Sequence, residues 1–167
     1  MKTAGRKPVE VRILCPPLHC LPPLWVALHD EKGFDVSKSV ASSRFRPRIT
    51  ATLSVRNWAR AVAFYKAAFG ATELYRVEGG GVAQLAVSDA EFWVAEESPE
   101  NLNFSPESLG GCSVRMLLIV EDPRAVCEQA VVAGATQVVP VVDAHGWRLG
   151  RIVDPFGHHW EVARPPS

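Results

Sequence analysis

The sequence has 167 residues, 47% of them hydrophobic and 22% charged, so it is long enough to bury a core in one or two small globular units. Its eighteen basic side chains are balanced by eighteen acidic ones. This balance excludes the strongly basic character of proteins that bind nucleic-acid phosphates, and the hydrophobic content excludes overall disorder.

The first 48 residues differ from the rest in charge and in proline content. They carry nine Lys or Arg against four Asp or Glu and six of the thirteen prolines, whereas residues 49–167 carry nine cations against fourteen anions, a net charge of −5. Proline fixes φ and lacks an N–H donor, so it obstructs continuous helices and central strands. Residues 1–48 are therefore predicted to be a disordered tail or, alternatively, the product of a misannotated start.

The longest apolar stretch of this tail, residues 13–28, is interrupted by four prolines and His19. A signal peptide needs about 7–15 unbroken apolar residues and a membrane-spanning helix needs about 20. Neither is expected here, so no membrane association and a cytoplasmic location are predicted. The four cysteines are too few for a disulfide framework, which fits a reducing compartment.

A repeat at an offset of 64 residues is the strongest signal in the sequence. Arg60-Ala61-Val62 is followed by Gly70-Ala71-Thr72, and the same two triplets recur as Arg124-Ala125-Val126 and Gly134-Ala135-Thr136. This agreement indicates two copies of one supersecondary module within residues 49–163. Module one is predicted over residues 49–97 and module two over residues 114–163.

Each copy is predicted to be one strand, one helix and three further strands. In module one a β-forming run at 49–55 precedes a helix from the N-cap Asn57 to the C′ glycine Gly70. Three short strand-like segments separated by turn residues follow, at 72–77, 82–87 and 91–95.

Module two repeats this order. A strand at 114–120 precedes a helix capped by Asp122, with Pro123 at its first position and Gly134 at its end. Its later strands, at 137–142, 148–153 and 159–163, are separated by His145-Gly146 and by Asp154-Pro155-Phe156-Gly157, whose spacing predicts a type I turn. Residues 98–113 are predicted to be a linker without a regular element, or alternatively a lid, and residues 164–167 a short C-terminal tail.

This module order and two segments carry a resemblance to a known family. Residues 63–71 read AFYKAAFGA, and residues 150–162 read GRIVDPFGHHWEV. The chain resembles the vicinal oxygen chelate superfamily, which includes glyoxalases, bleomycin-resistance proteins and extradiol dioxygenases, and within it the branch of 3-demethylubiquinone methyltransferase-like and phosphonate-operon proteins. The resemblance implies an α+β fold in which two tandem βαβββ modules curl into half-barrels around a cleft for a small ligand or a divalent metal. It also implies a homodimer.

In metal-using relatives, four His, Glu or Gln ligands come from the first and last strand of each module. Glu161 falls on one of these positions, but Arg115 stands at another, and a guanidinium that keeps its proton does not bind a cation. The first module offers Thr50 or Ala51 and Trp93 or Val94 at the remaining two positions, and Glu96 or Glu97 only after a shift of register. This ligand deficit predicts that no metal or other cofactor is used.

Other residues are candidates for the cleft. Arg115 and Glu161 are expected to form an ion pair on neighbouring strands, either as a structural pin or as an anion-recognising clamp. Strand alternation places His159 on the same face as Glu161, as a general base, a hydrogen-bond donor or a rim residue. Trp147 and Arg148, with His145 and Arg151 nearby, either bind a ring or an acidic group or are ordinary surface residues.

The predicted function is therefore a metal-independent small-molecule-binding protein with a cleft that includes Trp93, Arg115, His159 and Glu161. The net charge of −5 would favour cationic or neutral ligands, as in drug sequestration. The alternative is a metal-dependent lyase, isomerase or dioxygenase in which Glu161 and either Glu96 or Glu97 bind the ion. A third possibility is a module whose cleft is filled by its own side chains and whose role is association.

Overall fold

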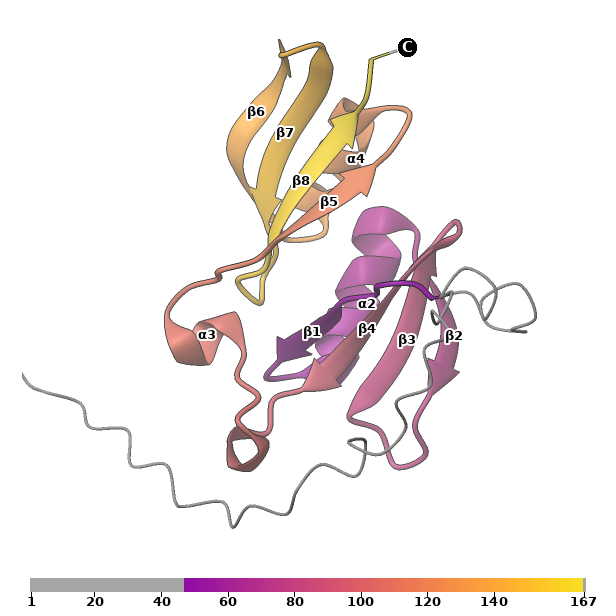
Figure 1. Ribbon diagram of the computed structural model, residues 1–167, viewed down its shortest axis with the longest axis vertical. Coiled ribbons are helices and arrows are strands. Elements are labelled where there is room, and N and C mark those ends of the chain that lie inside the picture. The colour runs from indigo at the N-terminus through magenta and orange to yellow at the C-terminus, as the bar shows by residue number, and fades with distance from the viewer. Residues whose placement is uncertain (1–46, 167) are drawn as a thin grey trace, which may run out of the picture. The chain divides into compact units, whose positions relative to one another are not determined.

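A computed structural model describes residues 47–166 of the chain (Figure 1). The predicted tail of residues 1–48, and the question of where translation starts, therefore lie almost entirely outside the described residues. Residues 47–167 group into one compact unit. Among residues 47–166, no helix combines the length and the apolar character needed to cross a membrane.

The first module has the predicted βαβββ order. It consists of β1 (Thr52–Val55), α2 (Trp58–Phe69), β2 (Thr72–Arg76), β3 (Val82–Val87) and β4 (Ala90–Glu96). Its four strands form a sheet in the order β1-β4-β3-β2, in which only the β1–β4 pair is parallel.

The second module repeats this arrangement. It consists of β5 (Arg115–Ile119), α4 (Pro123–Val132), β6 (Thr136–Ala144), β7 (Trp147–Val153) and β8 (His159–Arg164). The sheet order is β5-β8-β7-β6, and β5 pairs with β8 in parallel. Two open four-stranded sheets, each with its own helix, confirm the predicted α+β class and the internal repeat (Figure 1).

The helix ends are where the sequence signals place them. The Asn57 side chain accepts a hydrogen bond from the backbone N–H of Arg60, and Gly70 ends α2 with φ of 65°, a left-handed conformation that glycine adopts without strain. The Asp122 side chain accepts from the backbone of Arg124 and Ala125, with Pro123 next to it at the start of α4. The repeat thus extends to the capping chemistry of both helices.

The prediction that residues 98–113 lack a regular element is wrong. They contain a 3₁₀ turn, η1 (Pro99–Asn101), and one turn of α-helix, α3 (Pro106–Leu109). A proline begins each turn, where its fixed φ suits helix and its missing N–H leaves no bond unmade. The Ser105 hydroxyl also accepts from the backbone N–H of Ser108, which caps α3.

Strand lengths differ from the prediction at two places. β1 begins at Thr52 rather than at residue 49, and Ile49 is fully exposed. β6 extends to Ala144 because Asp143 and Ala144 also pair with β7, and its register shifts twice around Pro140, which contributes no N–H to the ladder.

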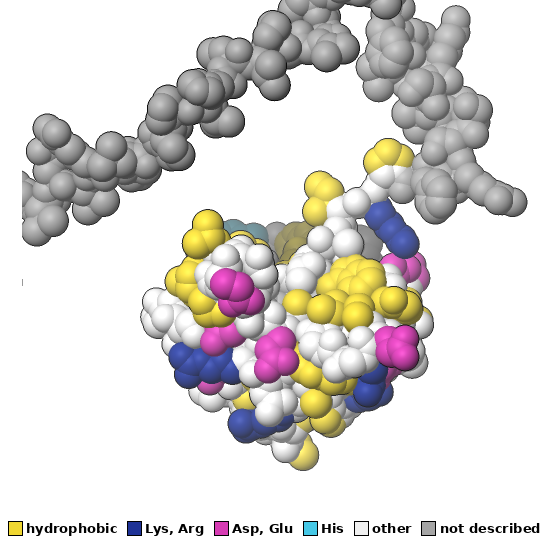
Figure 2. All heavy atoms as spheres, turned by 90° about the horizontal axis from the view of Figure 1, so that it is seen from below, with side chains coloured by type: hydrophobic (Ala, Val, Ile, Leu, Met, Phe, Trp, Pro, Cys, Tyr) yellow, Lys and Arg dark blue, Asp and Glu magenta, His cyan; other side chains and the backbone are white. Residues whose placement is uncertain are grey.

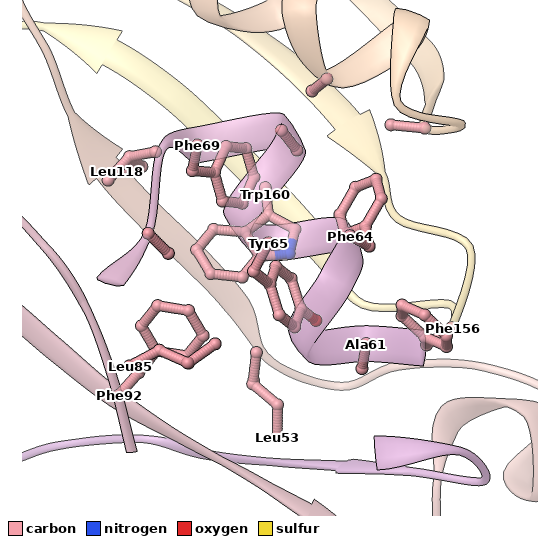
Figure 3. Packing of buried hydrophobic residues seen from close by; sticks show 14 of the residues in the cluster. Leu53, Ala61, Phe64, Tyr65, Phe69, Leu85, Phe92, Leu118, Phe156 and Trp160 are labelled. Carbon is pink, nitrogen blue, oxygen red and sulfur yellow. The ribbon is translucent and has the colours of Figure 1, made fainter. Parts of the chain in front are cut away.

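The core is built from aromatic side chains of both modules. Tyr65 of α2 lies among the other rings of the cluster, with Trp160 of β8 5.6 Å away between ring centroids (Figure 3). The remaining rings of this cluster are Phe64, Phe69, Phe92 and Phe156. Helices α2 and α4 also pack against each other. The two modules therefore share one hydrophobic core rather than folding around two separate ones.

Each sheet has one covered face and one open face. Helix α4 packs against β6, β7 and β8, and Ile152, Trp160 and Val162 are buried on that side. Because side chains alternate along a strand, the intervening residues of β7 and β8 point to the opposite face. That open face carries most of the candidate residues.

Candidate functional site

The register of the second sheet brings four candidate side chains to its open face. Arg115 of β5 lies opposite His159 of β8, and Leu117 lies opposite Glu161. On the other side of β8, Arg151 of β7 lies opposite Glu161. Two guanidinium groups, one imidazole and one carboxylate thus lie within one patch of the sheet.

Arg115 and Glu161 form the predicted ion pair, with Nη1 and Oε1 3.1 Å apart. The two side chains are 56% and 31% exposed, so the pair is partly solvated rather than buried. The interaction confirms the pairing expected from the sequence. Its exposure limits how much it adds to folding stability, because water screens the attraction.

A hollow of about 290 Å³ lies on the same face, beside Glu161. Trp147, one of the predicted residues, is part of its wall, and apart from Glu161 and His145 the lining is apolar: Leu117, Ala144, Trp147, Leu149 and Ala163. Apolar walls with few polar groups are typical of sites for small organic molecules. The volume suits a ligand at the small end of that class.

The two histidines of the β7–β8 connection have different surroundings. His159 is half-buried on the open face next to Arg115, as strand alternation predicts. His158 is only 7% exposed, and its Nε2 lies 3.0 Å from the backbone oxygen of Ser54 in β1. His158 therefore ties the turn to the backbone of the first module, and of these two histidines only His159 faces the open side of the sheet.

Two predicted cleft residues are not on this face. Arg148 lies three positions before Arg151 and points to the helix-covered side of the sheet, where its Nε is 2.9 Å from Asp143. Trp93 belongs to β4 of the other sheet, where its ring packs edge-on against Tyr75 with a centroid distance of 6.1 Å. The open face of the second sheet thus brings together four of the predicted residues, Arg115, Trp147, His159 and Glu161. Arg148 and Trp93 lie elsewhere.

The carboxylates considered as partners of Glu161 in a metal site do not fit that role. Glu96 follows Phe92 and Val94 in the alternation of β4 and therefore lies on the helix-covered face. Both oxygens of Glu97 are engaged, by the backbone N–H of Ser105 at 2.8 Å and the Ser108 hydroxyl at 2.9 Å. These hydrogen bonds lower the pKa of Glu97 to about 2.

Among residues 47–166, no three His, Cys, Asp or Glu side chains are grouped closely enough to hold a metal ion. Glu161 is already paired with a cation. The residues present at this site therefore do not match the three protein ligands that a divalent metal centre normally uses.

The sequence pattern does not single out Arg151 or Asp154 as a site residue. The sequence leaves open whether Arg151 helps to bind a ring or an acidic group or is an ordinary surface residue, and its position opposite Glu161, two residues before Val153, places it on the open face. For Asp154 the sequence pattern predicts only the start of a turn. The signal that was available is the Asp-Pro dipeptide after a buried strand, where a short carboxylate reaches the backbone N–H groups of its own turn.

A family model described as a glyoxalase-like domain matches residues 50–163. The chain belongs to the glyoxalase-like family. This membership places it in the vicinal oxygen chelate superfamily, as the paired βαβββ modules and the ending of the second module predict.

Relatives and structural neighbours agree with this assignment. An uncharacterized protein of Mycobacterium tuberculosis is 34% identical over 145 residues, which cover 82% of each chain. The crystal structure of an Arabidopsis thaliana gene product superposes with a TM-score of 0.58 at 31% identity, covering 71% of this chain and 98% of that one. A glyoxalase/bleomycin resistance protein/dioxygenase family enzyme from Burkholderia phytofirmans shares the fold at 16% identity, with a TM-score of 0.56 over 69% of this chain and 96% of that one.

Proposed function

We propose that this glyoxalase-like protein binds a small organic molecule on the open face of its second sheet and does so without a metal. The observation that carries the proposal is the Arg115–Glu161 pair beside the apolar hollow. The carboxylate that would be a metal ligand in relatives is held by a guanidinium in this chain, and the adjacent walls offer apolar contact and one indole ring.

The proposal includes a homodimer in the cytoplasm. Apolar side chains are exposed on the open faces of both sheets, Tyr75 on the first and Leu117, Ile119 and Val142 on the second. Figure 2 shows one face of the molecule on which hydrophobic side chains lie exposed among charged ones. A second copy that contacts Tyr75, Ile119 and Val142, which do not line the hollow, would remove apolar surface from water, which favours association.

Metal dependence is tested first, by mass spectrometry of untagged protein purified without chelator. The melting temperature is then measured with added nickel, zinc, manganese and iron(II). We expect protein without stoichiometric metal whose melting temperature is the same with all four ions. A stoichiometric metal together with a raised melting temperature would overturn the metal-independent proposal, because a ligand that binds only the folded state stabilises it.

Binding at the hollow is tested by fluorine NMR of protein labelled with 5-fluorotryptophan. The five tryptophans give separate signals, and the variant Trp147→Phe identifies the signal of Trp147. Small aromatic compounds that enter the hollow should shift this signal and leave that of the buried Trp160 unchanged. A Trp147 signal that no compound moves would count against a binding site on this face.

A further inference from the structure

Most of the ten Lys and Arg side chains within residues 47–166 have an acidic partner. Seven Lys or Arg side chains within residues 47–166 form ion pairs: Arg48, Arg56, Lys66, Arg76, Arg115, Arg148 and Arg164. Of the remaining three, Arg60 lies over the Phe156 ring at 5.9 Å, and Arg124 is exposed to water. The third is Arg151.

Arg151 differs from the other two because it is partly buried. Its Nε is inaccessible to water and, within residues 47–166, has no hydrogen-bond partner. A buried donor without a partner costs free energy, and one that belongs to a charged group costs more. Because this Nε is closed to water, a ligand can reach only the accessible part of the guanidinium, and a carboxylate bound there would offset the partly buried charge.

Arg151 does not line the hollow but lies next to residues that do. It lies opposite Glu161 and two residues after Leu149, and both of these line the hollow. No ion pair joins Arg151 to Glu161, whose carboxylate is engaged by Arg115 on the opposite side. The open face therefore carries two guanidinium groups against one carboxylate, so its local charge is positive although the domain as a whole is negative.

We infer that Arg151 is the recognition group for the carboxylate of an organic acid whose apolar body occupies the hollow beside Trp147. This inference rests on the proposed function and names its ligand class. A guanidinium donates two parallel hydrogen bonds to a carboxylate, and partial burial strengthens them. Arg115 contributes further positive charge while it remains held by Glu161. The local charge thus reverses the expectation of a cationic ligand that the net charge of the domain suggested.

The test compares three probes of one shape and different charge: phenylacetate, phenylacetamide and 2-phenylethylammonium. Each is titrated into full-length protein at low ionic strength, and the fluorine signal of Trp147 is followed. We expect phenylacetate to bind at least about tenfold more tightly than the neutral amide, in line with the strength of charged hydrogen bonds. The ammonium compound should bind most weakly, and added salt should weaken the binding of phenylacetate alone.

Two variants locate the effect. Arg151→Gln should remove the preference for phenylacetate over the amide, whereas Arg151→Lys should retain part of this preference. Arg148→Gln is the matched control, because it removes a guanidinium from the same strand but from the opposite face. The comparison of probes on the unmodified protein holds even if a variant at Arg151 fails to fold.

The outcomes separate this inference from the proposed function. Equal binding of the amide and the acid would overturn the role of Arg151 and leave a binding site in the hollow. An equal loss of the preference in Arg148→Gln would also overturn it, because the attraction would then come from overall charge. If none of the three probes moved the Trp147 signal up to millimolar concentration, both the inference and the proposed binding face would be wrong.

Discussion

The hydroxyl of Tyr65 in the first module donates a hydrogen bond of 2.6 Å to the carboxylate of Asp154 in the second. Asp154 is only 4% exposed, and it also accepts from the indole N–H of Trp160 at 3.0 Å and from the backbone N–H groups of Phe156 and His158 at 2.9 Å each. One buried carboxylate thus accepts hydrogen bonds from four donors. These bonds offset the cost of removing its charge from water, and they fix the turn that precedes β8. The same turn positions Glu161, so the contact between modules supports the candidate site.

Replacing Tyr65 with Phe should lower the free energy of unfolding by about 1.5–3 kcal/mol, the cost expected for losing a hydrogen bond to a charged group. The ring and its packing remain, so the change isolates the hydroxyl. Tyr75→Phe is the matched control, because Tyr75 is half-exposed and packs on Trp93 at the surface. Urea unfolding followed by circular dichroism measures both variants, and equal midpoints for the two would show that the Tyr65–Asp154 bond adds nothing.

Alkaline pH should destabilise the protein through the same pair. Burial, and after it the negative charge of Asp154, raise the pKa of Tyr65 well above its ordinary value of about 10. An unfolded tyrosine loses its proton near pH 10 while folded Tyr65 keeps it, so the free energy of unfolding falls as the pH rises beyond about 10. Unfolding midpoints measured across this range should decline more steeply for the natural protein than for Tyr65→Phe. Parallel declines would contradict this assignment.

The sequence predicted the parts of the structure that depend on local patterns. The caps Asn57 and Asp122 mark helix starts because their side chains reach backbone N–H groups only two or three residues away. The pairing of Arg115 with Glu161 could also be predicted, because the family resemblance implies that the first and last strands of a module are neighbours and alternation fixes the face.

What could not be predicted depends on how the modules pack. Tyr65 and its partner Asp154 lie 89 positions apart along the chain, and no local pattern encodes that contact. The solvent exposure of the Arg115 and Glu161 side chains could not be predicted from the sequence either, because it depends on which other parts of the fold cover the open face.

The glycines of the β2–β3 turn offer a test of close packing. A Cβ at Gly80 would lie 2.8 Å from Cζ2 of Trp58, whereas a Cβ at Gly81 would meet nothing within 4 Å. Both residues have positive φ, so Gly81→Ala costs about 1–2 kcal/mol from backbone strain alone. Gly80→Ala should cost a further 1–3 kcal/mol or so from the clash with the indole. Equal unfolding free energies of the two variants would show that Trp58 moves aside.

Low pH should destabilise the linker of residues 98–113, because it protonates Glu97. Hydrogen bonds from Ser105 and Ser108 lower its pKa to about 2, so its contribution to stability is present above about pH 4.5 and is lost as the pH falls towards 2. Amide hydrogen exchange at Ser105 reports the loss directly. Glu97→Gln should speed this exchange already at pH 5, whereas the control Glu96→Gln, at an exposed neighbour, should not. Exchange at Ser105 that is unchanged in Glu97→Gln would refute the anchoring role.

The Arg115–Glu161 pair tests whether this site is a structural pin or a binding surface. Because both side chains are partly exposed, Glu161→Gln and Arg115→Met should each lower the free energy of unfolding by no more than about 1 kcal/mol. Their coupling in a double-mutant cycle should be equally small and should shrink further in salt. A coupling of about 3 kcal/mol or more would mean that the pair is buried in solution and acts as a pin. A small coupling together with a loss of phenylacetate binding in Arg115→Met would mean that these charges serve a ligand rather than the fold.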